Sequence, residues 1–420
     1  MKKIFYLIFI IFCCLKSIYS FYLLLPMDEE QTNHLKSYGV VFNYLKDNIG
    51  EEAYWLLNYR GGSFVIEDNI RARNLCLLNE TKYLAITKEE LQKIEKIIEE
   101  NNMYKVKLEK APKVAVYIPP TSSPWDDAVS MVLEYSNIKY DKIYDEDILN
   151  EKLKEYDWLH LHHEDFTGQY DKFWDSYRNS AWYIKKVKTF ISEANRLGYK
   201  TVAEEKLAVA KKIKEFVFNG GFLFAMCSAT DSIDIALAAE GVDIIAPEID
   251  GTPITPNFEK KIDYSKTLAF KDFKIFPDPY FNPRSDIDGA WANTPARKEA
   301  KDFELFEFSA KFDYIPSILT QCHTKIVKGF YGLTTSFNLY TIKDDVIIMG
   351  KEIGEERAKY IYAPRGKGFF TFYGGHDPED YQHAIGEEPT NLNLHKNSPG
   401  YRLILNNLLF PAAKKEKLKT

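Results

Sequence analysis

The chain has 420 residues, of which 45% are apolar and 15% aromatic, and it carries a formal charge of −6. This length and composition exclude a disordered or fibrous chain and predict two domains, or one large domain with insertions. The acidic balance argues against a nucleic-acid partner.

The first 20 residues have the pattern of a secretory signal peptide. Lys2 and Lys3 precede an apolar run from Ile4 to Cys14, and cleavage is expected after Ser20. The run is too short to span a bilayer, and no later stretch reaches the required length. We therefore expect an exported protein, periplasmic or secreted, without integral membrane association.

Three cysteines follow the predicted leader, namely Cys76, Cys227 and Cys322. An odd number in an oxidising compartment leaves at least one thiol free. A disulfide between Cys76 and Cys322 would leave Cys227 free, and the sequence leaves that pairing open.

Residues 21–110 have the pattern of a small α/β module. Apolar runs bounded by turn residues predict short strands, and apolar residues at helical spacing predict two helices. The expected elements are strands at 21–25, 55–59 and 103–108 and helices at about 28–48 and 87–101.

Residues 111–410 alternate between predicted strands and helices, which is typical of βαβ units and a parallel sheet. Strands are expected at 114–118, 139–144, 158–162, 222–226, 326–331, 346–349 and 368–373, and helices at 126–135, 172–197, 202–218, 228–240 and 400–409. The stretch at about 247–310 is rich in Pro, Asp, Asn and aromatic residues, which indicates an irregular insertion. Residues 411–420 form a short basic tail.

The segment from Asn219 to Asp234, NGGFLFAMCSATDSID, joins an apolar strand to a helix through one cysteine. Cys227 must therefore occupy a sharp turn, and the small neighbours Ala225 and Ala229 fit the close crossing of a nucleophile elbow. The N-terminus of the following helix would favour a thiolate, so Cys227 is the expected nucleophile. The alternative is a buried structural cysteine.

The expected base is His376, which follows an aromatic strand and two glycines in the segment 366–380, GKGFFTFYGGHDPED. A cysteine nucleophile needs a base within hydrogen-bond reach, and that base needs a third group to orient it. Glu379 is expected to orient His376, with Asp377 as the alternative.

Histidines and acids gather where the predicted strand 158–162 ends, at His160, His162, His163, Glu164 and Asp165. Strand alternation puts His160 and His162 on one face, and the chain from His163 onward leaves the carboxyl edge of the sheet near Cys227. His163, Glu164 and Asp165 are expected to bind substrate. Two alternatives are a zinc or iron ion held by His160, His162 and His163, and rings that hydrogen-bond to neighbouring loops.

Three further residues are expected to contact substrate. Trp125 belongs to a loop that leaves the carboxyl end of the predicted strand 114–118, Arg284 belongs to the irregular insertion, and Asp377 follows the expected base. Together they would surround the same pocket as Cys227.

An elbow cysteine followed far downstream by a strand and His376-Asp377-Pro378-Glu379 resembles the class I glutamine amidotransferase-like superfamily, whose motif is His-Pro-Glu. The segments 366–380 and 399–410, PGYRLILNNLLF, are similar to its trehalose-utilisation (ThuA-like) branch. In that branch a strand reaches a Gly-His-Asp motif and an apolar helix closes the domain. The resemblance covers about residues 112–410 without the insertion.

The chain departs from the amidotransferase pattern at two places. Glu379 stands one position later than the glutamate of those enzymes, and residues 163–168, HEDFTG, replace the Pro-Gly-Gly loop of their oxyanion hole. Loss of one such donor costs about 3 kcal/mol of transition-state stabilisation, so hydrolysis of glutamine by the usual route is not expected. The ThuA-like branch commonly lacks the elbow cysteine.

Four segments extend the resemblance to the N-terminal part of the chain. Residues 23–39, 55–64, 156–170 and 225–234 resemble a group of exported Bacteroidetes proteins that often carries the label "asparagine synthetase B". The motifs do not support that label, because the chain has neither the N-terminal nucleophilic cysteine nor the Ser-Gly-Gly-x-Asp-Ser motif of that enzyme.

The expected fold is a flavodoxin-like α/β domain of the amidotransferase-like kind, with a mostly parallel sheet covered by helices on both faces, plus the small N-terminal α/β module. The expected function is a cysteine hydrolase that cleaves an amide or related acyl bond in a small molecule, a peptide or a carbohydrate-related substrate, with no cofactor. Two alternatives are a non-catalytic ThuA-like carbohydrate-related binding protein and a metal-dependent hydrolase built on His160–Asp165.

Overall fold

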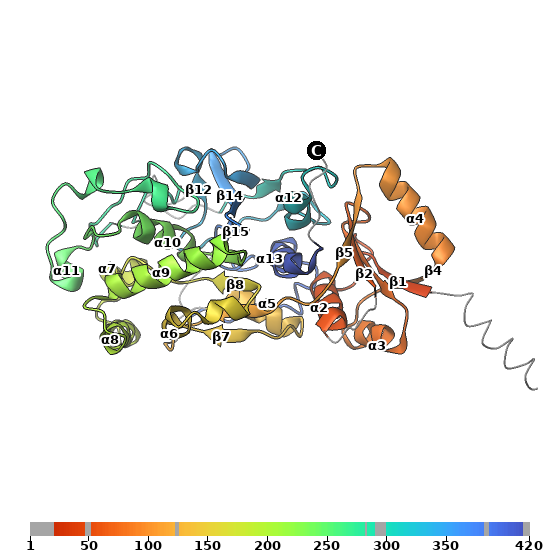
Figure 1. Cartoon of the computed structure of the whole chain (residues 1–420), viewed down its shortest axis with the longest axis horizontal. Coiled ribbons are helices and arrows are strands. Elements are labelled where there is room, and N and C mark those ends of the chain that lie inside the picture. Colours follow the sequence, from red (N-terminus) through yellow and green to blue (C-terminus); the bar gives the residue numbers. More distant parts are fainter. Residues whose placement is uncertain are drawn as a thin grey trace, which may run out of the picture.

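The computed structural model describes residues 21–46, 52–121, 126–281, 284–289, 300–381 and 386–414 (Figure 1). The predicted signal peptide, Trp125 and residues 415–420 of the basic tail lie outside the described residues. Within the described ranges, the structure contains no helix with the length and hydrophobicity of a membrane span.

The N-terminal module is a five-stranded antiparallel sheet in the order β4-β1-β3-β2-β5. Its alternating side chains separate two cores: Leu24, Leu56 and Val65 pack under one helix, α4, and Leu23, Trp55 and Phe64 face the rest of the molecule. The elements are β1 (Phe21–Leu25), α2 (His34–Lys46), β2 (Ala53–Leu57), β3 (Ser63–Glu67), α3 (Ile70–Leu78), β4 (Leu84–Thr87), α4 (Lys88–Glu100) and β5 (Tyr104–Leu108).

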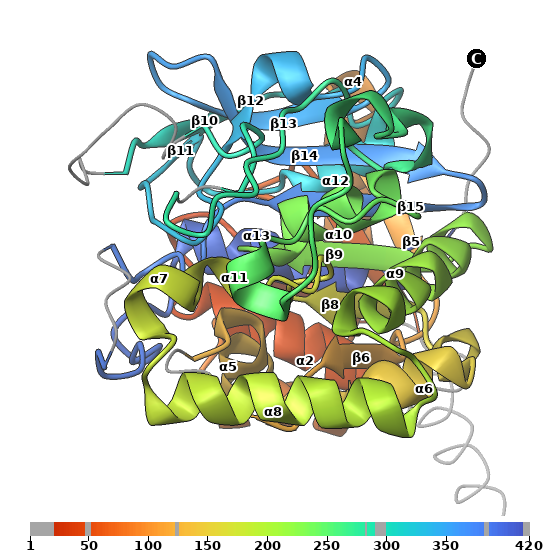
Figure 2. The same cartoon turned by 90° about the vertical axis from the view of Figure 1, so that its left-hand side faces the viewer.

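The second sheet has a parallel half that matches the expectation. Its strands β6 (Val114–Tyr117), β7 (Asp141–Ile143), β8 (Trp158–Leu161), β9 (Phe222–Met226) and β15 (Gly368–Tyr373) lie in the order β7-β6-β8-β9-β15. Counted along the chain this is the order 2-1-3-4-5 of flavodoxin-like sheets. Figure 2 shows β15, β9, β8 and β6 one below another.

The prediction of a mostly parallel sheet is wrong, because five of the ten strands in the described part of this sheet are antiparallel. β14 (Arg357–Arg365) pairs antiparallel with β15, and the sheet continues through β13 (Ile347–Glu352), β10 (Phe303–Leu305) and β11 (Ile326–Val327), with β12 (Phe337–Asn338) on β14. β10 lies near the end of the predicted insertion, whose described residues also contain the short helix α11 (Pro247–Asp250).

Helices cover both faces of the second sheet, as expected. Phe222, Phe224 and Met226 of β9 face the core beneath α5 (Ala128–Tyr135), α13 (Pro399–Leu409) and α2, whereas Leu223 and Ala225 face the core beneath α9 (Val202–Phe218) and α10 (Ala229–Ala238). The remaining α-helices are α6 (Asp145–Leu149), α7 (Trp174–Tyr177), α8 (Ala181–Arg196), α11 (Pro247–Asp250) and α12 (Tyr314–Leu319).

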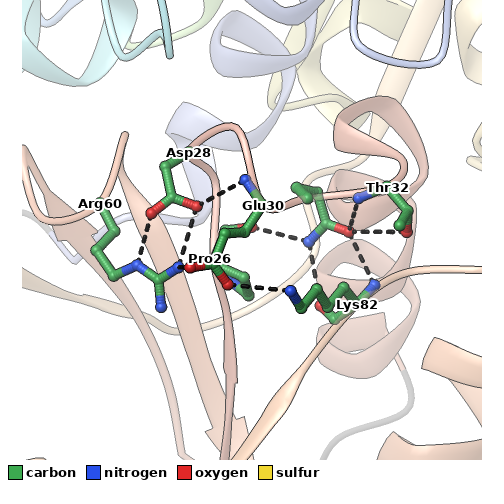
Figure 3. A network of polar contacts seen from close by, with 7 residues as sticks. Pro26, Asp28, Glu30, Thr32, Arg60 and Lys82 are labelled. Carbon is green, nitrogen blue, oxygen red and sulfur yellow. Dashed lines mark hydrogen bonds and ion pairs between the residues drawn. The ribbon is translucent and has the colours of Figure 1, made fainter.

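A buried arginine joins the two sheets through α13. The guanidinium of Arg402 is inaccessible to solvent and donates hydrogen bonds to the carbonyl oxygens of Met27 (2.8 Å) and Gly61 and to the hydroxyl of Tyr38 (3.2 Å). The loop that follows β1 is also held by a second network (Figure 3), in which Asp28 pairs with Arg60 at 2.6 Å. The N-terminal module is therefore fixed to the C-terminal helix.

We expect the ion pair between Lys206 of α9 and Asp145 of α6 to be essential to the stability of the second sheet's helical layer. The two groups are buried and 2.5 Å apart. Lys206→Met should lower the free energy of unfolding by roughly 3–5 kcal/mol, because it leaves a buried carboxylate without its counter-charge. Chemical denaturation measures this loss. Lys212→Met on the same helix, which removes half-exposed ion pairs, should change stability by less than about 1 kcal/mol.

Candidate functional site

Three adjacent parallel strands bring the predicted site residues together. His162 and His163 follow β8, Cys227 follows β9 and His376 follows β15, and all of them leave the carboxyl edge of the sheet. This edge is where open α/β sheets form their sites.

Backbone hydrogen bonds fix the three strand ends to one another. The Cys227 N–H donates to the Gly375 carbonyl at 3.0 Å, and the Ala229 N–H donates to the His162 carbonyl at 3.1 Å. The loop before His376 is therefore attached to the elbow on one side, and the loop after β8 on the other.

Cys227 adopts the geometry of an elbow. It follows β9 directly and is separated from α10 by Ser228, the N-cap of that helix. Its φ of 51° lies in the left-handed region that a residue with a Cβ seldom occupies. The sharp turn expected from the sequence is present. Such a conformation costs about 1–3 kcal/mol, and strained residues of this kind gather at functional sites.

The expected thiolate is not favoured, because the structure buries the sulfur completely. Cys227 is 0% exposed. Burial raises the pKa of its thiol to about 11, although the N–H groups of Leu333 and Ser228 and the charge of Lys172 act in the opposite direction. Desolvation therefore raises the pKa of the thiol by more than the N-terminus of α10 lowers it.

Residues 329–336, here called the covering segment, lie over the sulfur. The Leu333 N–H donates to Cys227 Sγ at 3.2 Å. Lys172 Nζ donates to the Leu333 carbonyl (2.9 Å) and to Thr334 Oγ1 (3.0 Å), and the Thr334 hydroxyl donates to Asp231 Oδ1 (2.8 Å). Lys359 Nζ holds the same segment through the carbonyls of Phe330 and Thr335.

Four donor atoms meet beneath this cover. One nitrogen each from His162, His163 and His376 and the sulfur of Cys227 all lie within 4.8 Å of one another. The ring centroids of the histidines are 4.1–4.6 Å apart. This arrangement can carry either a thiol–imidazole proton transfer or the coordination of a soft metal ion.

Glu379, the expected orienting group, has other partners. Its carboxylate accepts a hydrogen bond from the Tyr381 hydroxyl (2.6 Å) and lies 3.0 Å from His395 Nδ1. Asp377 is buried and accepts a hydrogen bond from the N–H of Glu379 at 2.9 Å.

Sequence reasoning missed Asp127, which lies next to two of the histidines. Its Oδ2 is 3.2 Å from His162 Nδ1 and 3.5 Å from His160 Nε2, while Oδ1 caps α5 through the Ser130 N–H. Burial disfavours its charge, but the charges and hydrogen bonds of His162 and His160 hold the pKa of Asp127 well below its usual range. Its position just before a predicted helix indicated only a capping role.

The other expected substrate residues lie beside the Cys227 turn. A cavity of about 10 Å³, room for one water molecule, is lined by residues that include Asp165, Lys172, Ser228, Asp231 and Arg284. Glu164 is buried, and its backbone carbonyl accepts a hydrogen bond from the Ser232 hydroxyl at 2.7 Å. Substrate would therefore need the covering segment to move.

No family model and no curated protein matches the sequence. Among solved structures, a cytoplasmic protein of Salmonella typhimurium is 11% identical to this chain, with a TM-score of 0.35. The match covers 72% of this chain and 100% of the Salmonella protein. A second cytoplasmic protein, from strain LT2, is 11% identical with a TM-score of 0.35, over 72% and 99%. A Thermoplasma acidophilum protein, proposed to be one of the subunits of GMP synthase, is 9% identical with a TM-score of 0.32, over 71% and 94%. Similarity at this level indicates neither a family nor an activity for the chain.

We expect the pH dependence of Cys227 alkylation to follow its raised pKa. In chelator-treated protein, the rate of reaction with iodoacetamide should keep rising with pH toward about 11, because the protonated thiol dominates below that value. Peptide mapping by mass spectrometry separates Cys227 from Cys76 and Cys322. A plateau reached near neutral pH would contradict the closed arrangement.

Thr334→Val should loosen the covering segment. It removes hydrogen bonds to the charged groups of Asp231 and Lys172, each worth roughly 1.5–3 kcal/mol, so iodoacetamide should label Cys227 at least about 100-fold faster. Thr324→Val, outside the covering segment, is the matched control. An equal acceleration at the buried Cys76 would indicate global unfolding instead.

Proposed function

We propose that this protein is an exported hydrolase whose reaction centre is the thiol–imidazole pair of Cys227 and His376. The observation that carries the proposal is a cysteine held at φ of 51° at a strand–helix elbow, with an imidazole nitrogen of His376 within 4.8 Å of its sulfur. A glycine would make this turn without strain, so the presence of a strained thiol favours chemistry over packing.

The proposed reaction is cleavage of an amide or related acyl bond in a small molecule, peptide or carbohydrate-related substrate. After the covering segment moves, His376 accepts the Cys227 proton and the sulfur attacks the carbonyl carbon. His376 then gives the proton to the leaving amine, and water hydrolyses the resulting thioester. The N–H of Ser228, the residue after the nucleophile, is the first candidate donor for the oxyanion.

The sequence resemblance to amidotransferase-like proteins supports this class of reaction. The two departures from their pattern, at residues 163–168 and at Glu379, argue for a substrate other than glutamine. The half-buried ring of His163 and the acids Glu164 and Asp165 are the proposed substrate contacts beside the reaction centre.

A panel of chromogenic amides and thioesters tests the proposal on chelator-treated protein. Cys227→Ser should lower turnover by roughly 10³-fold or more, and His376→Gln by about 10²–10⁴-fold, as expected for a general base. Intact mass should reveal an acyl adduct on Cys227 in the wild type and none in Cys227→Ser.

Cys322→Ser and His395→Gln are the matched controls, because they remove a half-buried cysteine and a histidine paired with Glu379. Both should retain wild-type turnover. Full activity in Cys227→Ser would place the nucleophile elsewhere, whereas ligand binding without turnover in the wild type would favour the non-catalytic alternative.

A further inference from the structure

Four side chains of the types that coordinate transition metals meet at the ends of β8, β9 and β15. Every pair among the donor atoms of Cys227, His162, His163 and His376 is separated by 4.8 Å or less. A tetrahedral Zn²⁺ with bonds of about 2.0–2.3 Å keeps its ligand atoms roughly 3.3–3.7 Å apart. No pair of these atoms would therefore need to approach by more than about 1.5 Å to reach this geometry.

His162 supplies an independent sign of a ligand. It is 1% exposed, and its Nε2 has no hydrogen-bond partner within the described part of the chain. A buried polar nitrogen without a partner costs about 1–3 kcal/mol, and a metal ion would remove that cost.

Asp127 gives His162 the support that metal-binding histidines require. Asp127 Oδ2 lies 3.2 Å from Nδ1 in an ion-pair contact, and a carboxylate at this distance favours the tautomer of His162 that carries its proton on Nδ1. Carboxylates fix the tautomer and orientation of ligand histidines in this way. Asp127 is in turn held as the N-cap of α5 and by His160.

The three imidazole rings pack against one another. The ring centroids of His162 and His163 are 4.1 Å apart, and both centroids lie within 4.6 Å of the ring centroid of His376. One ion could therefore reach a nitrogen of each ring.

We propose that Cys227, His162, His163 and His376 bind one Zn²⁺-class ion, with Asp127 as the residue that positions His162. Thiolate and imidazole are the ligand types that zinc takes in tetrahedral sites, whereas magnesium and calcium prefer oxygen ligands. Binding releases the proton of Cys227 to solvent. The site does not depend on the proposed hydrolase, but in the metal-bound form Cys227 is a ligand and the hydrolase is latent.

The test uses the full mature chain, stripped with a chelator and titrated with Zn²⁺ and with Co²⁺. Native mass spectrometry should show one ion per chain, and the Co²⁺ form should show the thiolate-to-cobalt charge-transfer band and the intense visible bands of tetrahedral cobalt. Cys227→Ser should lose the charge-transfer band. His376→Gln and Asp127→Asn should each weaken binding by about 10- to 100-fold.

His395→Gln and Cys322→Ser are the controls, and both should keep the band and the affinity of the wild type. Circular dichroism establishes that each variant is folded. A folded wild type that takes up no stoichiometric Zn²⁺ or Co²⁺ overturns the proposal, as does a charge-transfer band that survives in Cys227→Ser.

Alkylation of Cys227 with and without bound metal separates this proposal from the hydrolase. Metal binding should slow labelling by at least about tenfold and leave Cys76 unchanged, because a coordinated thiolate is not free to attack. If metal binds but the stripped protein forms no acyl adduct, only the hydrolase fails. If the adduct forms but metal does not bind, only the metal site fails.

Discussion

The register of three parallel strands is the constraint on which the site depends. Leu161 pairs with Ala225 between β8 and β9, and Phe372 pairs with the same Ala225 between β15 and β9. Because the three strands end at nearly the same level, the residues that leave them must meet. If the register of any of these strands changed by one residue, its side chains and the residue that follows it would point to the opposite face of the sheet.

Much of this frame could be predicted from the sequence, because it depends on local signals. The apolar run before Cys227 and the helical pattern after it predicted the sharp turn, and strand–helix alternation predicted the parallel half of the second sheet. In the antiparallel half, β11 and β13 overlap the expected strands at 326–331 and 346–349. β14 was missed, since it reads RAKYIYAPR, with charged ends and a proline near its end. In the N-terminal module α3 was missed, because its exposed Ile70, Leu77 and Leu78 disrupt the amphipathic pattern.

The electrostatics of the site were beyond the reach of sequence reasoning. The N-terminus of α10 is visible in the sequence, but the covering segment lies about a hundred residues further along the chain, and it removes water from the sulfur. The same applies to the partner of His162. Glu379 lies near His376 in sequence but pairs with Tyr381 and His395, whereas Asp127 reaches His162 and His160 only through the fold. The catalytic and binding roles of the site residues stay predictions, and the structure shows which of these residues lie close together.

Arg402 couples the two ends of the chain. The carbonyl groups that accept its hydrogen bonds, on Met27 and Gly61, belong to the first module, while Arg402 itself lies in the last helix. The part of α2 that packs against α13 is covered only when that helix is in place. A chain that loses α13 would therefore leave Tyr38 and the apolar residues beside it exposed to aggregation.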